Sequence, residues 1–152
     1  MKRLVFCLLA LASLSAFSED AQVKRGRYLV GIAGCNDCHT PGFAMKGGQV
    51  DEARWLTGDA LGWRGPWGTT YPSNLRLYMQ TLGEDEWVRK AKTLTTRPPM
   101  PWFNLHRMSA GDLRAIWRYV RNLGPAGKPA PQYVPPDRTP SPPYVQFPAP
   151  PK

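Results

Sequence analysis

The residues most clearly suited to chemistry are Cys35-Asn36-Asp37-Cys38-His39. Two cysteines separated by two residues and followed at once by histidine form the attachment pattern of haem c: each thiol forms a thioether, and the imidazole binds the iron. The cysteine pair alone also suits a thioredoxin-like dithiol or half of a zinc site. A zinc site needs two more ligands, and after residue 18 the chain has no further cysteine and only His106 besides. A thioredoxin motif requires a βαβ context that the sequence lacks. We therefore predict one covalently bound haem.

The second axial ligand of the iron is expected from segment 97–103, Arg-Pro-Pro-Met-Pro-Trp-Phe. Its three prolines remove backbone donors and hold the chain extended, so that we expect no helix there. The segment would then present Met100 as a rigid support, which makes Met100 the preferred distal ligand. His106 is the serious rival, because imidazole binds iron well. The other rivals after residue 18 are Met45, Met79 and Met108.

The element expected to deliver the chain to this motif is a helix over residues 19–33, ended by Gly34. Gly26 would permit close contact with a second helix. The residues that we expect to face inward are Val23, Tyr28 and Leu29. The next segment, 40–74, is rich in Gly, Pro and Trp and is predicted to be mainly loop. A loop of this length normally has a function, here to cover the haem edge with aromatic rings and to offer N–H and O–H groups to the propionates. The rings concerned are Trp55, Trp63, Trp67 and Tyr71, and for each single ring simple core packing is the favoured alternative to a propionate bond.

Two further helices are predicted from apolar periodicity and end signals. The first begins near Gly83 and Glu84, with an acidic first turn that suits the helix dipole. Its apolar face comprises Trp87, Val88, Ala91 and Leu94. The second runs from Ser109 to about Leu123, starts with a capping-box variant and stops at Gly124-Pro125. Its buried stripe comprises Leu113, Ile116, Tyr119, Val120 and Leu123.

Residues 1–18 read as a secretory signal peptide, with Lys2 and Arg3 before an apolar run and a small-x-small cleavage site at Ala16-Phe17-Ser18. The alternative is an uncleaved membrane anchor, although the run is shorter than the roughly 20 residues of a spanning helix. Cleavage would also remove Cys7, which leaves only the two cysteines of the haem motif and no structural disulfide. The expected location is the periplasm.

The chain is basic, with a net charge of +9 that cleavage at Ser18 would lower by two. Export across the cytoplasmic membrane argues against a nucleic-acid partner, as does the dispersed placement of the basic residues. An acidic docking partner or an anionic membrane surface would suit this charge, and an ordinary solvated surface would explain it equally well. The charge alone does not choose between these interpretations.

Residues 125–152 hold 11 of the 17 prolines and are predicted to form an extended tail with polyproline character. The aromatic residues Tyr133, Tyr144 and Phe147 indicate that the tail lies against the domain or a partner, and a free tail is the alternative. The expected organisation is therefore a signal peptide over 1–18, a haem domain over 19–124 and a tail over 125–152.

Taken together, these features resemble monohaem class I cytochrome c domains, particularly those that accompany membrane-associated bacterial alcohol and aldehyde dehydrogenases. Besides the haem motif, the resemblance rests on Arg25 to Leu29, on Trp67 to Asn74, on Pro99 to Trp102, on the start of the last helix and on the Pro-rich end. It implies a small all-α fold with helices packed around one haem c. It also implies thioethers at Cys35 and Cys38, His39 as proximal ligand and Met100 as distal ligand. The related subunits often carry three such domains, whereas this chain has one haem motif and no internal repeat.

The function predicted from this ligand set is periplasmic electron transfer, because a protein that fills both axial positions leaves no iron site for a substrate. We expect an electron carrier, not an enzyme, with redox partners such as a periplasmic dehydrogenase, an oxidase or another cytochrome. Any membrane association would come through such a partner. One alternative is a fixed electron-transfer subunit of a membrane-associated dehydrogenase or oxidase complex. The other is a haem enzyme or gas-binding protein with an open iron site.

Overall fold

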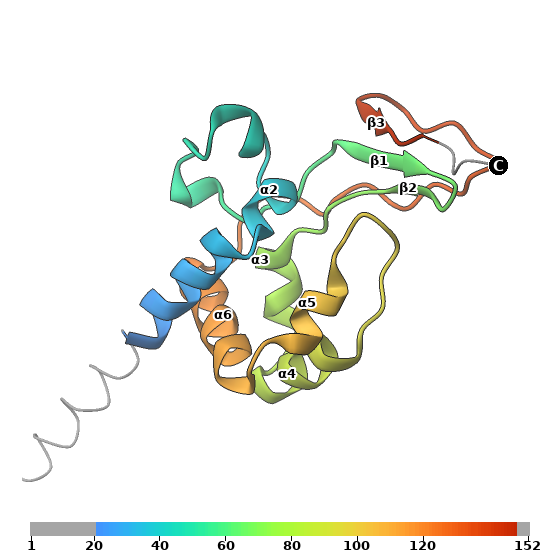
Figure 1. The fold of residues 1–152 in the computed structure, drawn as a ribbon. Helices are drawn as coiled ribbons and strands as arrows, with labels where there is room; N and C mark the ends of the chain where they lie inside the picture. The colour runs from blue at the N-terminus through green and yellow to red at the C-terminus, as the bar shows by residue number, and fades with distance from the viewer. Residues whose placement is uncertain (1–20, 149–152) are drawn as a thin grey trace, which may run out of the picture.

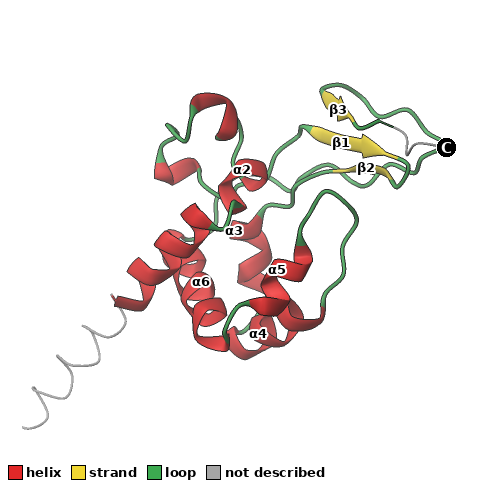
Figure 2. Ribbon diagram, in the orientation of Figure 1, coloured by secondary structure: helices red, strands yellow, loops and turns green. Residues whose placement is uncertain are grey.

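The structure, a computed structural model, describes residues 21–148. The expected signal peptide over residues 1–18 lies outside the described residues. Figure 1 shows a helical body from which a small sheet extends, with the described end of the tail beside that sheet. Figure 2 shows that long loops join the two parts. The chain therefore combines a helical body with a β-structured extension.

The helical body is built around a close crossing of two helices. Residues 21–32 are helical, and they cross α6 (Ala110–Leu123) at Gly26. A Cβ atom at Gly26 would overlap the carbonyl oxygen of Ala115, so only glycine allows this approach. The predicted role of Gly26 is confirmed. Around the crossing lies one apolar core, whose largest buried side chains include Val30, Leu56, Met79, Leu113, Tyr119 and Val120.

The prediction that Tyr28 faces this core is wrong. Its side chain is 54% exposed, whereas Leu29 and Val30 are buried. The buried positions Gly26, Leu29 and Val30 follow the i, i+3, i+4 spacing of one helix face, and Tyr28 falls outside that face. Its ring instead lies under the Arg25 guanidinium, 5.5 Å from ring centroid to Cζ. A tyrosine tolerates this position because its hydroxyl can stay in water.

The other two predicted helices form as expected. In α4 (Glu84–Thr93), Gly83 is the N-cap and Trp87 and Ala91 are buried. In α6, the Ser109 side chain accepts a hydrogen bond from the Asp112 N–H, and the helix ends before Gly124 at φ 72°. The buried indole of Trp87 donates to the Leu113 carbonyl at 2.8 Å and so ties the two helices together. Both sets of end signals are thus confirmed.

The candidate haem stretch itself forms a short helix, α2 (Cys35–His39). Gly34 separates it from the preceding helix and adopts φ 72°, a left-handed conformation that favours glycine. Two 3-10 turns follow, η1 (Ala44–Lys46) and η2 (Glu52–Arg54). The predicted helix end at Gly34 is confirmed, and the bend there turns α2 away from the helix that delivers it.

A three-stranded sheet is the main addition to the all-α fold that we predict. Strands β1 (Gly62–Gly65) and β2 (Gly68–Thr70) form an antiparallel hairpin. The tail contributes β3 (Tyr144–Gln146), which pairs in parallel with the other edge of β1, giving the order β2-β1-β3. The prediction of a mainly looped segment 40–74 therefore missed this hairpin, because glycine-rich strands lack the usual strand composition. The assignment to the class I cytochrome c fold stays a prediction.

A short helix, α3 (Leu75–Tyr78), and the 3-10 turn η3 (Met79–Thr81) lead from the sheet back to the body. Asn74 caps α3, because its side chain accepts a hydrogen bond from the Leu77 N–H at 3.0 Å. The buried guanidinium of Arg76 donates to the carbonyl groups of Leu123 and Gly124 and so binds the carboxyl end of α6. This arginine joins α3 to α6.

Between α4 and α5 (Trp102–Arg107) lies the segment that carries Met100. Residues 97–101, which we call the Met100 strap, are not helical, as predicted. The prediction is wrong for Trp102 and Phe103, which begin α5 with Pro101 as the N-cap. A proline next to the first turn is tolerated, because the first N–H groups of a helix lack intrahelical partners. Figure 1 shows this segment reaching back toward β2.

The described part of the tail lies against the domain, one of the arrangements expected. Asn74 donates to the carbonyl groups of Ala126 and Lys128, and Thr69 and Val134 exchange two backbone hydrogen bonds. The later part of the tail supplies β3. Within residues 21–148, no helix is both long and apolar enough to cross a lipid bilayer.

Candidate functional site

The His39 imidazole is buried and oriented in the way that an iron ligand requires. Its Nδ1 lies 2.7 Å from the carbonyl oxygen of Ser73, so Nδ1 must be the donor and Nε2 carries the lone pair. Among the described residues, Nε2 has no hydrogen-bond partner. Burial lowers the pKa of His39, which favours the neutral ring that binds metals. A metal-binding histidine usually donates its other ring N–H in this manner.

The two candidate attachment residues both precede this histidine on α2. Burial raises the pKa of Cys35 to about 11, and burial also raises the pKa of Cys38. Both are therefore protonated thiols at neutral pH, and they form no disulfide with each other. A redox dithiol needs the opposite environment, one that lowers the pKa of the attacking thiol. The surroundings of the pair thus argue against the thioredoxin-like alternative.

Buried hydrogen bonds attach α2 to the loop that follows it. The Thr40 hydroxyl donates to the Asn36 side chain at 2.7 Å and accepts from the Leu56 N–H at 2.8 Å. The His39 carbonyl accepts from the Gly58 N–H at 2.8 Å. Asn36 and Thr40 are almost fully buried, so these bonds are shielded from water. The loop after the motif therefore holds the backbone of α2 at His39, while the Ser73 carbonyl orients the ring.

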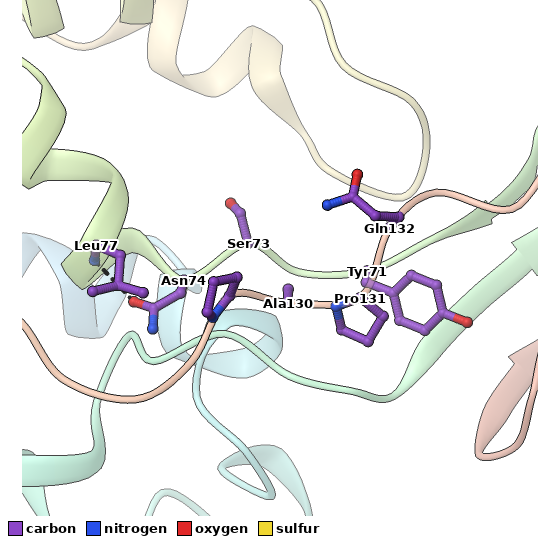
Figure 3. A pocket seen from close by; sticks show the side chains of 8 residues that line it. Tyr71, Ser73, Asn74, Leu77, Ala130, Pro131 and Gln132 are labelled. Atoms are coloured by element: carbon purple, nitrogen blue, oxygen red, sulfur yellow. Dashed lines mark hydrogen bonds between the residues drawn. The ribbon is translucent and has the colours of Figure 1, made fainter.

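A cavity of about 280 Å³ lies beside Ser73, the residue whose carbonyl receives the His39 hydrogen bond. Its walls come from residues before and within α3 and from the tail: Tyr71, Ser73, Asn74, Leu77 and residues 129–132. Figure 3 shows the side chains of Ser73 and Gln132 directed to the same side of this space. The tail thus forms one wall of this cavity.

The aromatic loop offers one free donor out of the indole groups that we expect at the haem edge. Trp55 and Trp67 donate to the backbone carbonyls of Val50 and Trp63. The Trp63 Nε1 is buried and has no partner among the described residues. A buried donor without a partner is costly, and a carboxylate brought into the site would satisfy it. Of these three indole groups, that of Trp63 is therefore the one left to donate to a further acceptor.

Met100 is half-buried and packs against the same apolar core as Cys35. Met79 is only 1% exposed and serves core packing, as predicted, whereas Met45 is 88% exposed. Met108 is the C-cap of α5 and packs on the core, and its carbonyl accepts from Lys92. Met100 and Met108 are both partly buried. Of these two, only Met100 lies in a proline-rich segment without helical structure.

The structure gives His106 a role that competes with iron binding. Its Nε2 lies 2.9 Å from the Leu94 carbonyl and must donate to it, and its ring packs against Trp102 at a centroid distance of 4.9 Å. The hydrogen bond joins α5 to the end of α4, and the ring contact lies within α5. Nε2 of His106 is therefore occupied, whereas Nε2 of His39 is not.

Within residues 21–148, no three His, Cys, Asp or Glu side chains gather closely enough to hold a metal ion. A zinc site of the usual kind needs four such ligands. No family model, curated protein or solved structure matches the chain. The assignment of the site therefore depends on the residues themselves.

The residues present fit a covalently attached haem. They supply two adjacent thiols, a neutral histidine with a free Nε2, an unpartnered buried indole N–H and a partly buried methionine. Sequence reasoning named all of these residues but assigned no role to Ser73, which acts through its backbone carbonyl. A backbone acceptor leaves no signature in side-chain types, so only the fold could identify it.

Proposed function

We propose that this chain is a periplasmic electron-transfer protein with one haem c. Cys35 and Cys38 hold the group through thioethers, His39 is the proximal ligand and Met100 is the distal ligand. A bound haem would supply a one-electron ferric and ferrous couple. This proposal extends the resemblance to class I cytochrome c domains.

The observation that supports the proposal most strongly is the hydrogen bond between His39 Nδ1 and the Ser73 carbonyl. It leaves Nε2 available in a ring that stands directly after the two thiols. The partner also orients the ring and raises its basicity as a ligand. A histidine that served packing alone would not need a free ring nitrogen, whereas an iron ligand does.

The proposed ligand set makes the protein an electron carrier, not an enzyme. With His39 and Met100 on the iron, no axial position is open to a substrate, and electrons pass without bond making. The haem enzyme or gas-binding protein considered above requires an open or readily exchanged position. The proline-rich strap favours the closed site, because a restrained segment loses less entropy when it holds its side chain on the iron.

The proposed partners are redox proteins of the periplasm, such as a dehydrogenase, an oxidase or another cytochrome. Exposed basic residues, among them Arg89 and Lys90 on α4, would favour an acidic docking surface. The described part of the tail already pairs with β1, which supports a free carrier over a subunit whose tail serves as an extended anchor. A fixed place in a membrane-associated complex remains the alternative proposal.

Visible spectra of the purified protein test this proposal. The oxidised protein should show the weak far-red band of a sulfur ligand on ferric iron, and the reduced protein should not bind carbon monoxide at neutral pH. Rapid binding of carbon monoxide by the reduced wild type would support the haem enzyme or gas-binding alternative. A protein that acquires no haem in a host able to attach haem c would refute the proposal.

A further inference from the structure

The Met100 strap, residues 97–101, has few hydrogen bonds of its own. Residues 97–99 belong to neither a helix nor a strand, and the carbonyls of Met100 and Pro101 accept only from the first turn of α5. The Pro98 carbonyl accepts from the Thr70 hydroxyl of β2 at 2.8 Å. One residue earlier, Cζ of Arg97 lies 3.8 Å from the ring centroid of Tyr133, which belongs to the tail. Two side chains from outside the strap therefore fix its first half.

Tyr133 is itself held firmly by the sheet. Its hydroxyl donates to the Trp67 carbonyl at 2.9 Å. The next residue, Val134, exchanges hydrogen bonds of 2.7 and 3.0 Å with the backbone of Thr69 in β2. The ring thus has a fixed position although it is 37% exposed. A flexible arginine stacked on it gains a fixed position as well.

We propose that Tyr133 is a positioning residue for Met100. The tail, through the stacking of Tyr133 on Arg97, holds the strap closed and thereby limits the access of external ligands to the distal side of the iron. This inference rests on the proposed function, because it takes Met100 as the iron ligand. It goes beyond that function by giving the tail a role in the ligand set of its own domain.

The physical reason lies in the weakness of a thioether as a ligand. A weak ligand stays on the metal when its own chain restrains it, because the entropy of the free state is then small. The prolines restrain the strap internally, but they do not attach it to the rest of the molecule. Thr70 and Tyr133 supply that attachment, one from the hairpin and one from the tail.

The tail provides a matched control. Tyr144 lies in β3, is also 37% exposed and also carries an arginine over its ring, Arg64 at 5.9 Å. None of its described contacts is to the strap. Tyr144→Leu therefore removes an equivalent ring from the same tail without touching Arg97.

The experiment is a spectral titration of the oxidised holoprotein with imidazole, which competes with Met100. Tyr133→Leu and Arg97→Gln should each raise the apparent affinity for imidazole about two- to fivefold, the factor that corresponds to an exposed cation–π contact. Combining the two should add nothing, because both remove one interaction. Tyr133→Phe keeps the ring but loses the hydroxyl bond to the Trp67 carbonyl, so it should raise the affinity less than Tyr133→Leu does. Tyr144→Leu should match the wild type.

Hydrogen exchange provides a readout that does not depend on the iron. Peptides that cover residues 94–102 should exchange faster in Tyr133→Leu than in wild type or Tyr144→Leu. If the wild type shows the far-red band but Tyr133→Leu changes neither imidazole affinity nor exchange, the positioning role is refuted and the proposed function stands. If the wild type lacks the band, the Met100 assignment fails, and this role of Tyr133 fails with it.

Discussion

The two sides of the candidate site are built in different ways. The His39 side is enclosed: Asn36 and Thr40 are almost fully buried, and His39 has a backbone partner. The Met100 side is open: Arg97, Pro98 and Pro101 are exposed, and the strap is attached by side chains at the surface. Buried, water-shielded hydrogen bonds resist opening far more than exposed contacts do. The proposed proximal ligand is thus held by buried hydrogen bonds, whereas the proposed distal ligand is held by contacts at the surface.

The largest effect is expected from removing the thiols on the enclosed side. The double variant Cys35→Ala, Cys38→Ala should contain no covalently bound haem, because both thioethers are lost. Haem content per polypeptide is measured by absorbance after denaturation. Asp37→Asn, which keeps both thiols, is the control and should retain the wild-type content. Covalent haem in the double variant would place the attachment elsewhere.

The open side is tested by Met100→Ala. This variant should lose the far-red band and bind carbon monoxide when reduced, because the distal position becomes vacant. His106→Ala is the control: it should keep the band and cost about 1 kcal/mol of stability through loss of the bond to the Leu94 carbonyl. Absorbance and carbon monoxide titration measure both outcomes. A band that survives Met100→Ala but not His106→Ala would reverse the ligand assignment.

A substitution at the close helix crossing in the helical body should lower the unfolding free energy of the whole domain. Gly26→Ala places a methyl group against the Ala115 carbonyl and should cost about 1–3 kcal/mol of unfolding free energy. Gly31→Ala is the matched control, since nothing lies within 4 Å of its Cβ position, and it should stabilise the helix by about 0.5–1 kcal/mol. Denaturant unfolding measures both. Equal effects of the two substitutions would contradict the close helix crossing.

The smallest effect concerns a polar link of the helical body. Glu52 binds the Arg27 guanidinium at 2.9 Å and the Tyr119 hydroxyl at 2.7 Å. The hydrogen bond from Arg27 lowers the pKa of Glu52 below its ordinary value of 4.5, while burial raises the pKa of Tyr119. A carboxyl with a lowered pKa stabilises the folded state above pH 4.5, and this contribution is lost as the pH falls through the folded pKa.

Glu52→Gln should therefore be less stable than the wild type at pH 7, and the difference should shrink below pH 4.5. Unfolding midpoints measured from pH 7 to pH 3 give this profile. A difference that stays constant down to pH 3 would show that the Glu52 charge does not contribute.

The helical body could be predicted from the sequence to a much greater extent than the sheet. Helices α4 and α6 were predictable because caps and apolar periodicity are local signals: Gly83, Ser109 and Gly124 mark ends that the structure reproduces. The sheet was not predictable, because β1 and β3 lie about 80 residues apart in the chain and β1 contains Gly62 and Gly65. Such pairing depends on the path of the tail and leaves no local pattern.

The candidate site shows the same division. The thiols, His39 and Met100 stand out by residue type and spacing, whereas their supports do not. Ser73 acts through its carbonyl, and Tyr133 acts on Arg97 across 36 positions of sequence. Helix α5 escaped prediction because three prolines precede it, although the last of them serves as its N-cap. The reactive residues of a site can thus be identified from the sequence, whereas the contacts that position them require the structure.

The central claim, a haem held covalently at Cys35 and Cys38, is tested most directly by extraction with acidified organic solvent. The protein is produced in a host able to attach haem c, precipitated, and extracted without reduction or digestion. The haem absorbance should stay with the polypeptide, because thioether bonds survive acid that breaks iron coordination. Haem that passes into the solvent from the wild-type protein would contradict the claim.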